Sequence, residues 1–134
     1  SYRPISLLPA ISKLFEKLLL NRLLAFINEN NIIPPEQFGF RKGHSTIHQL
    51  LRLKNKILEH KAVSKSTAMA LLDVEKAFDN VWHDGLIYKL CLLNTPVYLV
   101  KIIRSYLKDR TFRVSLNNVE SGNCLIPAGV PQGS

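Results

Sequence analysis

The spacing of apolar residues changes along this chain, and that change limits the folds open to it. In most of the chain up to Leu107, apolar side chains recur at steps of three and four residues, which is the period of an amphipathic helix. From Phe112 to Leu116 they alternate with polar side chains, which is the period of a strand. Helical segments together with strands indicate one unit of mixed helix and strand, or part of one.

The local signals predict individual elements. Helices are expected over residues 10–28, 46–63, 85–93 and from Pro96 to Leu107, with Thr46 and Gln49 as a capping box at the start of the second. Residues 67–72 are small or apolar without helical phasing, which favours a buried strand that ends at Asp73. Asn117-Asn118 predicts the turn of a hairpin over 111–126.

The composition of the chain indicates which kinds of binding partner and which cellular location to expect. The 134 residues fit one domain, and 18 Lys and Arg against 10 Asp and Glu give a formal net charge of +8. This excess favours nucleic acid, although a merely basic, soluble surface is an equal alternative from charge alone. Cys91 and Cys124 lack a zinc-ligand spacing and a disulfide framework, so we expect an intracellular protein. We expect no membrane span, and the missing initiator Met suggests an internal segment of something longer.

The segment LLDVEKAFDNV, residues 71–81, is the most informative for chemistry. An Asp that closes a strand carries its carboxylate on rigid backbone, and Mg²⁺ is bound by one or two such oxygen ligands together with substrate phosphates. Asp73 meets that requirement, although an Asp that caps the following turn is an equal alternative. Asp79 is better explained as a turn residue.

Two further segments offer binding groups. In AGVPQGS, residues 128–134, Gly and Pro enforce an irregular backbone that can approach a ligand, and Gln132 offers an amide. In QFGFRKGHST, residues 37–46, the cationic or titratable side chains Arg41, Lys42 and His44 lie just before a helix start, where phosphate contacts are favoured. Taken alone, AGVPQGS is more often an ordinary loop than a site, and for QFGFRKGHST a solvated basic loop is an equal alternative.

These segments, with the opening SYRPISLLPAISKLFEKLLLNRL, follow the order and approximate spacing of the first blocks of non-LTR retrotransposon reverse transcriptases, and are similar to the jockey-like elements. The resemblance covers essentially the whole chain. It implies the α+β fold class of a right-hand polymerase, with helical fingers over 1–66 and the N-terminal part of an antiparallel palm sheet over 67–134.

The resemblance also implies roles for individual residues. Asp73 would be a ligand of two catalytic Mg²⁺ ions, with Mn²⁺ as a substitute, and the Val74 carbonyl would assist one ion. Phe78 would exclude a ribose 2′-hydroxyl, while Gln132 and Arg3 would contact the incoming nucleotide.

The same resemblance assigns nucleic-acid contacts to Arg41, Lys42 and His44. The implied partners are an RNA template, a DNA primer and deoxynucleoside triphosphates; the oligomeric state stays open. For the full-length protein we expect a nuclear location.

One departure from the family pattern matters. The later aromatic-x-Asp-Asp block does not occur in these residues, so we expect the 134 residues alone to be inactive and the full-length protein to be an RNA-directed DNA polymerase. The alternative is a non-enzymatic RNA- or DNA-binding module from a decayed or co-opted element. An in-frame Asp-Asp block downstream of Ser134 would distinguish the two. A two-metal nuclease is weaker, because carboxylates are few.

Overall fold

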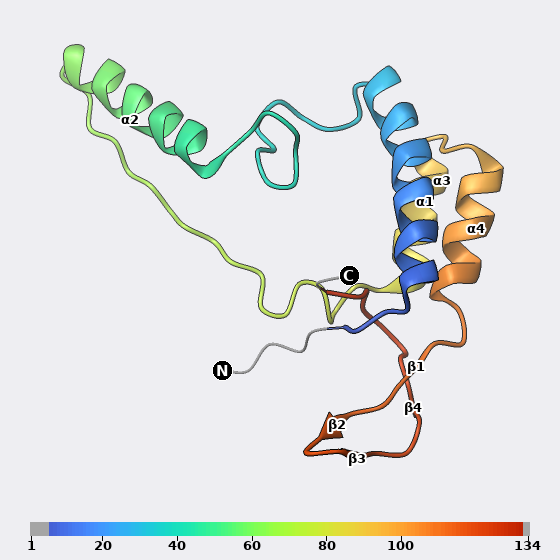
Figure 1. Ribbon diagram of the computed structural model, residues 1–134. Coiled ribbons are helices and arrows are strands. Elements are labelled where there is room, and N and C mark those ends of the chain that lie inside the picture. Colours follow the sequence, from blue (N-terminus) through green and yellow to red (C-terminus); the bar gives the residue numbers. More distant parts are fainter. Residues whose placement is uncertain (1–5, 133–134) are drawn as a thin grey trace. The chain divides into compact units, whose positions relative to one another are not determined.

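The computed structural model describes residues 6–132, and these residues form two compact units (Figure 1). One unit comprises the described parts of Ser1–Asn30 and Val74–Ser134, and the other comprises Asn31–Asp73. Each unit is described by itself below. The expected division into fingers over 1–66 and palm over 67–134 concerns polymerase subdomains and stays a prediction.

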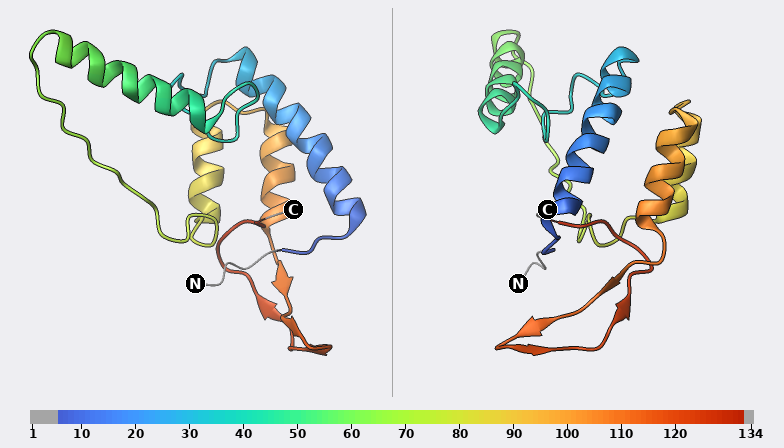
Figure 2. Two further views of the ribbon diagram at one scale, coloured as in Figure 1. Left: turned by 60° about the vertical axis from the view of Figure 1, so that its left-hand side comes forward. Right: turned by 45° about the vertical axis from the view of Figure 1, so that its right-hand side comes forward.

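The larger unit is built on three helices. They are α1 (Ala10–Glu29), α3 (His83–Leu92) and α4 (Val97–Leu107). Asn94 adopts a positive φ of 55° just after α3, and Pro96 directly precedes α4, so the chain turns back within a few residues. As a result α3 and α4 lie side by side (Figure 2). Leu99 is 1% exposed, and with Leu107 it forms the buried apolar centre of this pair.

Tyr106 connects α4 to α1. Its ring centroid lies 6.1 Å from that of Phe15, and its hydroxyl donates a hydrogen bond to the Glu16 carboxylate. The Arg110 guanidinium lies over the same ring, 4.8 Å from the centroid. Partial burial, followed by the hydrogen bond to Glu16, raises the pKa of Tyr106. A neutral tyrosine hydroxyl is therefore part of the contact between the two helices.

A β-hairpin follows α4. In it, β1 (Thr111–Phe112) pairs antiparallel with β4 (Cys124–Leu125), and β2 (Ser115–Leu116) pairs antiparallel with β3 (Val119–Glu120). Asn117 and Asn118 have φ values of 48° and 63°, which a two-residue hairpin turn of the primed type requires. Asparagine tolerates positive φ better than most residues, so the sequence itself favours the turn at this point.

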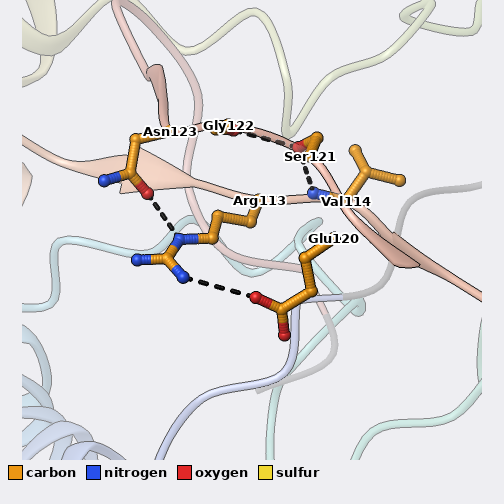
Figure 3. A network of polar contacts seen from close by, with 6 residues as sticks. All are labelled: Arg113, Val114, Glu120, Ser121, Gly122 and Asn123. Carbon is orange, nitrogen blue, oxygen red and sulfur yellow. Dashed lines mark hydrogen bonds and ion pairs between the residues drawn. The ribbon is translucent and has the colours of Figure 1, made fainter. Parts of the chain in front are cut away.

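An extra residue interrupts this hairpin between its two strand pairs. The registers Ser115 with Glu120 and Phe112 with Cys124 leave residues 113–114 facing residues 121–123, as in a β-bulge. At this point a side chain satisfies one backbone amide, and Arg113 connects the two strands (Figure 3). The Val114 amide donates to the Ser121 hydroxyl at 2.9 Å, and Arg113 donates to Asn123 at 2.6 Å and to Glu120 at 3.3 Å.

The smaller unit contains α2 (Thr46–Ala62). The prediction of a capping box at Thr46 and Gln49 is wrong by one residue, because the cap is Ser45. Its hydroxyl accepts a hydrogen bond from the His48 amide at 3.3 Å, which satisfies an amide that has no partner inside the helix. A serine just before a threonine allows either residue to cap, and the sequence pattern does not separate the two.

The expected buried strand over 67–72 is also wrong. These residues have no regular secondary structure and are exposed, with Leu72 95% exposed. A strand is stabilised by pairing with a neighbour, and no described residue pairs with this segment. Apolar composition alone therefore misled the prediction here, and Asp73 does not close a strand as expected.

The remaining expected elements are confirmed. The helices predicted over 10–28, 46–63, 85–93 and from Pro96 to Leu107 correspond to α1, α2, α3 and α4, and the hairpin lies within 111–126. The α+β class therefore holds for the described residues. None of the helices within residues 6–132 is long and apolar enough to span a membrane.

The Tyr106 contact predicts a pH-dependent stability difference. Because the folded-state pKa is raised above the ordinary value of about 10, the hydroxyl stabilises the fold fully below pH 10 and loses this effect as pH rises through the folded pKa. Tyr106→Phe should lower the free energy of unfolding by about 1 kcal/mol at pH 7. The difference from the wild type should shrink above pH 10 in urea unfolding experiments.

Tyr98→Phe is the matched control, since Tyr98 is an exposed tyrosine on the same helix. It should leave stability within about 0.5 kcal/mol of the wild type. Equal effects of the two substitutions would show that the hydroxyl of Tyr106 contributes nothing specific.

Candidate active site

The loop at the C-terminal end of the described chain is hydrogen-bonded to the turn that follows Val74. The Gly129 amide donates to the Val81 carbonyl at 2.9 Å, and the Val130 amide donates to the Phe78 carbonyl at 2.8 Å. The His83 Nε2 atom lies 2.7 Å from the Gly129 carbonyl oxygen, and Gly129 is buried. Two segments that are about fifty residues apart in sequence are thus held together by backbone groups.

Gly129 is required at this contact for two reasons. Its φ of +92° lies in the region that L-residues with a side chain rarely adopt. A Cβ atom would also lie 2.8 Å from the Asp79 carbonyl oxygen and 3.0 Å from that of Phe78. The close approach of the two backbones therefore depends on the absence of a side chain.

A third segment joins the same region. The Ser6 amide donates to the Gln132 carbonyl at 2.9 Å, so the residues before α1 lie next to the C-terminal loop. Parts of the opening segment, the LLDVEKAFDNV segment and the AGVPQGS segment consequently meet within one unit. Of the residues predicted to bind the nucleotide, Phe78 and Gln132 belong to this meeting point, and Arg3 lies outside the described residues.

The turn over residues 75–80 positions Phe78. The amides of Asp79 and Asn80 both donate to the Lys76 carbonyl at 3.0 Å, and the Asn80 side-chain amide donates to the Glu75 carbonyl at 3.2 Å. Lys76 adopts a φ of 50° within this turn. The exposed Asp79 is accordingly a residue of the turn, as its sequence context indicates.

Asp73 and Val74 lie where the two units join. Asp73 is the last residue of the smaller unit and is exposed, while Val74 is the first residue of the second stretch of the larger unit. The expected cleft that joins Asp73 with Phe78 and Gln132 therefore involves both units and stays a prediction. The role of Asp73 as a metal ligand likewise stays a prediction.

The donor atoms of Asp73 and Val74 can be compared with the needs of a divalent metal ion. A carboxylate and a backbone carbonyl are oxygen donors, which is the ligand type that Mg²⁺ prefers. Residues 6–132 contain no cluster of three or more His, Cys, Asp or Glu side chains placed to hold a metal ion. The two residues therefore fit part of a metal site by their chemistry, and substrate phosphates or further carboxylates would have to supply the other ligands.

The predicted nucleic-acid contacts lie in the smaller unit, in a loop that packs around Phe38. The His44 ring meets the Phe38 ring edge-on at a centroid distance of 4.9 Å, and the Arg52 guanidinium lies 5.9 Å from the same centroid. Arg52 also forms an ion pair with Glu36 at 3.3 Å. The loop is thus tied to α2 through an aromatic side chain.

Within this loop, the predicted contacts differ in how they are held. Arg41 donates to the Pro34 carbonyl at 3.4 Å, and His44 Nδ1 lies 3.1 Å from the Lys42 carbonyl oxygen. Lys42 itself is exposed. The three side chains therefore occur together on one loop before α2, as the sequence indicated, and their contact with phosphate stays a prediction.

Sequence patterns do not single out Phe38, Arg52 or His83. Phe38 and Arg52 are separated in sequence by the basic loop, and their contact follows from the way the loop folds back on α2. His83 contacts Gly129 across 46 residues. Its position just after the LLDVEKAFDNV segment is the one sequence signal that could have drawn attention to it.

Adding a single methyl group at position 129 should destabilise the fold strongly. Gly129→Ala should lower the free energy of unfolding by about 1–3 kcal/mol, because it forces an L-residue into positive φ and against the Asp79 carbonyl. Gly122→Ala is the control, since a Cβ there meets nothing within 4 Å. Urea unfolding of both variants should separate them, and equal stabilities would contradict this view of the contact.

Comparison with known proteins identifies the family of the chain. The family described as reverse transcriptase (RNA-dependent DNA polymerase) matches residues 1–134. The chain is 48% identical over 135 residues to the RNA-directed DNA polymerase from mobile element jockey of Drosophila melanogaster, covering 100% of this chain and 14% of that protein. It is 47% identical over 135 residues to the probable RNA-directed DNA polymerase from transposon BS of the same fly, covering 100% of this chain and 15% of that protein.

A similar match extends to the probable RNA-directed DNA polymerase from transposon X-element of Drosophila melanogaster, at 42% identity over 134 residues, with 100% of this chain and 15% of that protein covered. No solved structure matches the chain. The chain spans about one seventh of the length of these relatives. Over its whole length, it belongs to the reverse transcriptase family and resembles the enzymes of jockey-like non-LTR retrotransposons.

Proposed function

We propose that the protein containing this chain synthesises DNA on an RNA template. The observation that carries the proposal is the family match over residues 1–134, and the jockey and BS relatives are named as RNA-directed DNA polymerases. The contact of Gly129 with Phe78 and Asp79 supports it, because it joins two of the segments on which the family resemblance rests. In this reaction a primer 3′-hydroxyl attacks the α-phosphorus of a nucleotide and pyrophosphate leaves.

Members of this family generally use divalent metal ions. We propose two Mg²⁺ ions, with Mn²⁺ as a substitute, and Asp73 and the Val74 carbonyl among their ligands. When bound, such ions stabilise charge on the attacking and leaving oxygens. The contribution of Asp73 is one negative charge, carried two residues before the turn over 75–80 that contains Phe78.

Phe78 and Gln132 are proposed to act on the incoming nucleotide. The Val130 amide donates to the Phe78 carbonyl, so the backbone of this partly buried residue is held next to the loop that carries Gln132. A rigid ring at the sugar excludes an extra hydroxyl by its volume, without forming a bond to the substrate. Arg3 is proposed to contact the triphosphate.

The proposed nucleic-acid contacts involve the basic loop. The substrates and partners are an RNA template, a DNA primer and deoxynucleoside triphosphates, and Arg41, Lys42 and His44 would contact the sugar-phosphate backbone. The net charge of +8 supports a polyanionic partner. We further propose that residues 1–66 belong to the fingers and 67–134 to the palm of a right-hand polymerase, and that the full-length protein acts in the nucleus.

Replacing Asp73 tests the catalytic part of this proposal. In the longer protein that contains the chain, Asp73→Asn removes the charge with little change in volume. It should lower kcat for DNA synthesis on a poly-rA template with an oligo-dT primer by about 100-fold or more. Primer–template affinity should change little, because the carboxylate is proposed to bind the metal ions and not the nucleic acid.

Asp79→Asn is the control, since Asp79 is an exposed aspartate of the adjacent turn. It should retain most of the activity. Comparable losses in both variants would place the effect in the turn and not in Asp73, and an active Asp73→Asn enzyme would remove this residue from catalysis.

Replacing Phe78 tests sugar selection. Phe78→Val shortens the side chain at the proposed sugar site, so ribonucleotides should be incorporated more readily while deoxyribonucleotides stay usable. The ratio of kcat/KM for a deoxyribonucleotide to that for its ribonucleotide should fall by about tenfold or more. Phe112→Val, at an exposed phenylalanine in the hairpin, should leave the ratio unchanged. An unchanged ratio for Phe78→Val would show that Phe78 does not select the sugar.

A further inference from the structure

Trp82 is an exposed aromatic residue next to the candidate active site. It is the single tryptophan of the chain and is 72% exposed. The residues on both sides of it are fixed, because the Val81 carbonyl accepts from the Gly129 amide and the His83 ring contacts the Gly129 carbonyl. The indole is therefore carried on a rigid backbone that is directly connected to the AGVPQGS loop.

The indole lies on the first turn of α3. A Cβ atom on Gly85 would lie 2.4 Å from Cε3 and 3.0 Å from Cδ2 of Trp82, so only a glycine allows the ring to approach the helix this closely. Since the side chain is nevertheless largely exposed, the part of the ring that does not contact the helix is open to solvent. Such a supported ring can accept a flat partner without ordering a mobile side chain.

Trp82 is also one of the residues that line a hollow of about 350 Å³ in the same unit. Among the residues that line it are Trp82 and Asp84 from the start of α3, Arg104 and Lys108 from the end of α4, and Ile126 from the return of the hairpin. This volume is within the range of small-molecule sites in proteins. The hollow thus combines one aromatic ring, apolar side chains and a few charged groups.

The charges of this hollow favour a ligand whose inserted part is neutral. Arg104 and Lys108 are balanced by Asp84 and Asp109, and the Lys108 ammonium lies 3.6 Å from the Asp109 carboxylate. A nucleobase is neutral and has a flat face that can stack on the indole. Its edge N–H groups can donate hydrogen bonds to a carboxylate such as that of Asp84. The cationic side chains could then meet the attached phosphates.

We propose that Trp82 and this hollow bind an unpaired base of single-stranded nucleic acid beside the active site. The proposal rests on the nucleic-acid-directed function proposed above, and adds a subsite to it. The net charge of +8 would hold the strand electrostatically, while Trp82 would hold one base by stacking. The site would therefore distinguish a strand with bases from its sugar-phosphate backbone alone.

Tryptophan fluorescence tests the subsite directly, because every change in the signal of this chain comes from Trp82. The probes are a single-stranded oligoadenylate RNA and an abasic oligomer of the same length and charge. The oligoadenylate should quench the fluorescence in a saturable manner, and the abasic oligomer should not. Quenching by both probes alike would show that the ring senses only the backbone, and would overturn the proposal.

Substitutions give a second measurement, by anisotropy of the labelled RNA. Trp82→Ala should raise the Kd for oligoadenylate by about tenfold or more, and Trp82→Phe should recover part of the affinity. The slope of log Kd against log salt concentration should stay the same, because no phosphate contact is removed. Tyr88→Ala is the control, since Tyr88 is an exposed aromatic residue of α3 that does not line the hollow.

The outcomes separate the subsite from the proposed function. Salt-dependent RNA binding that is unaffected by Trp82→Ala and gives no fluorescence change would overturn the subsite and leave the proposed function standing. No RNA binding by the wild-type chain, with its helices intact by circular dichroism, would contradict both. In the longer protein, RNA carrying 5-iodouracil should cross-link to Trp82 on irradiation, and adducts confined to other residues would overturn the subsite.

Discussion

The close backbone contact at Gly129 is the constraint on which the rest of this site depends. Two amides and one imidazole connect the Gly129 loop with residues 78–83, and no side chain other than hydrogen fits at position 129. The two amide hydrogen bonds join backbone groups across a long sequence separation, so they hold the backbone of Phe78 next to the loop of Gln132 without depending on the side chains of these residues. The same bonds fix the backbone on both sides of Trp82, so one contact supports both proposed binding surfaces.

Local sequence signals were sufficient to predict those elements that are formed by residues close together in the sequence. The helices follow from three- and four-residue spacing, and the hairpin turn follows from Asn117-Asn118, whose positive φ values suit the turn. The strand expected over 67–72 failed because a strand needs a partner, and apolar composition contains no information about one. The cap of α2 at Ser45 was missed by one residue, since adjacent Ser and Thr are equivalent candidates.

In the candidate site, too, the sequence did not predict contacts between residues that are distant in the chain. Family resemblance pointed to Phe78 and Gln132, and the structure places their segments together, but spacing could not show that His83 and Gly129 form the connection. The bulge at Ser121 and the packing of Phe38 against Arg52 arise only when distant residues meet. For Asp73 the sequence supplies the carboxylate and the motif to which it belongs. Because Asp73 lies at the junction of two units, the residues that would share a metal ion with it stay a prediction.

The central proposal is that Asp73 and the loop of Gln132 contribute to one metal-dependent site. Iron-directed cleavage measures this most directly. With Fe²⁺ in place of Mg²⁺, ascorbate and peroxide cut the backbone within a few Å of the bound ion. In the longer protein with primer, template and nucleotide bound, cuts are predicted near Asp73 and within residues 128–132, and both should be lost in Asp73→Asn. Cleavage at only one of these segments, or cleavage that persists in the variant, would contradict the account.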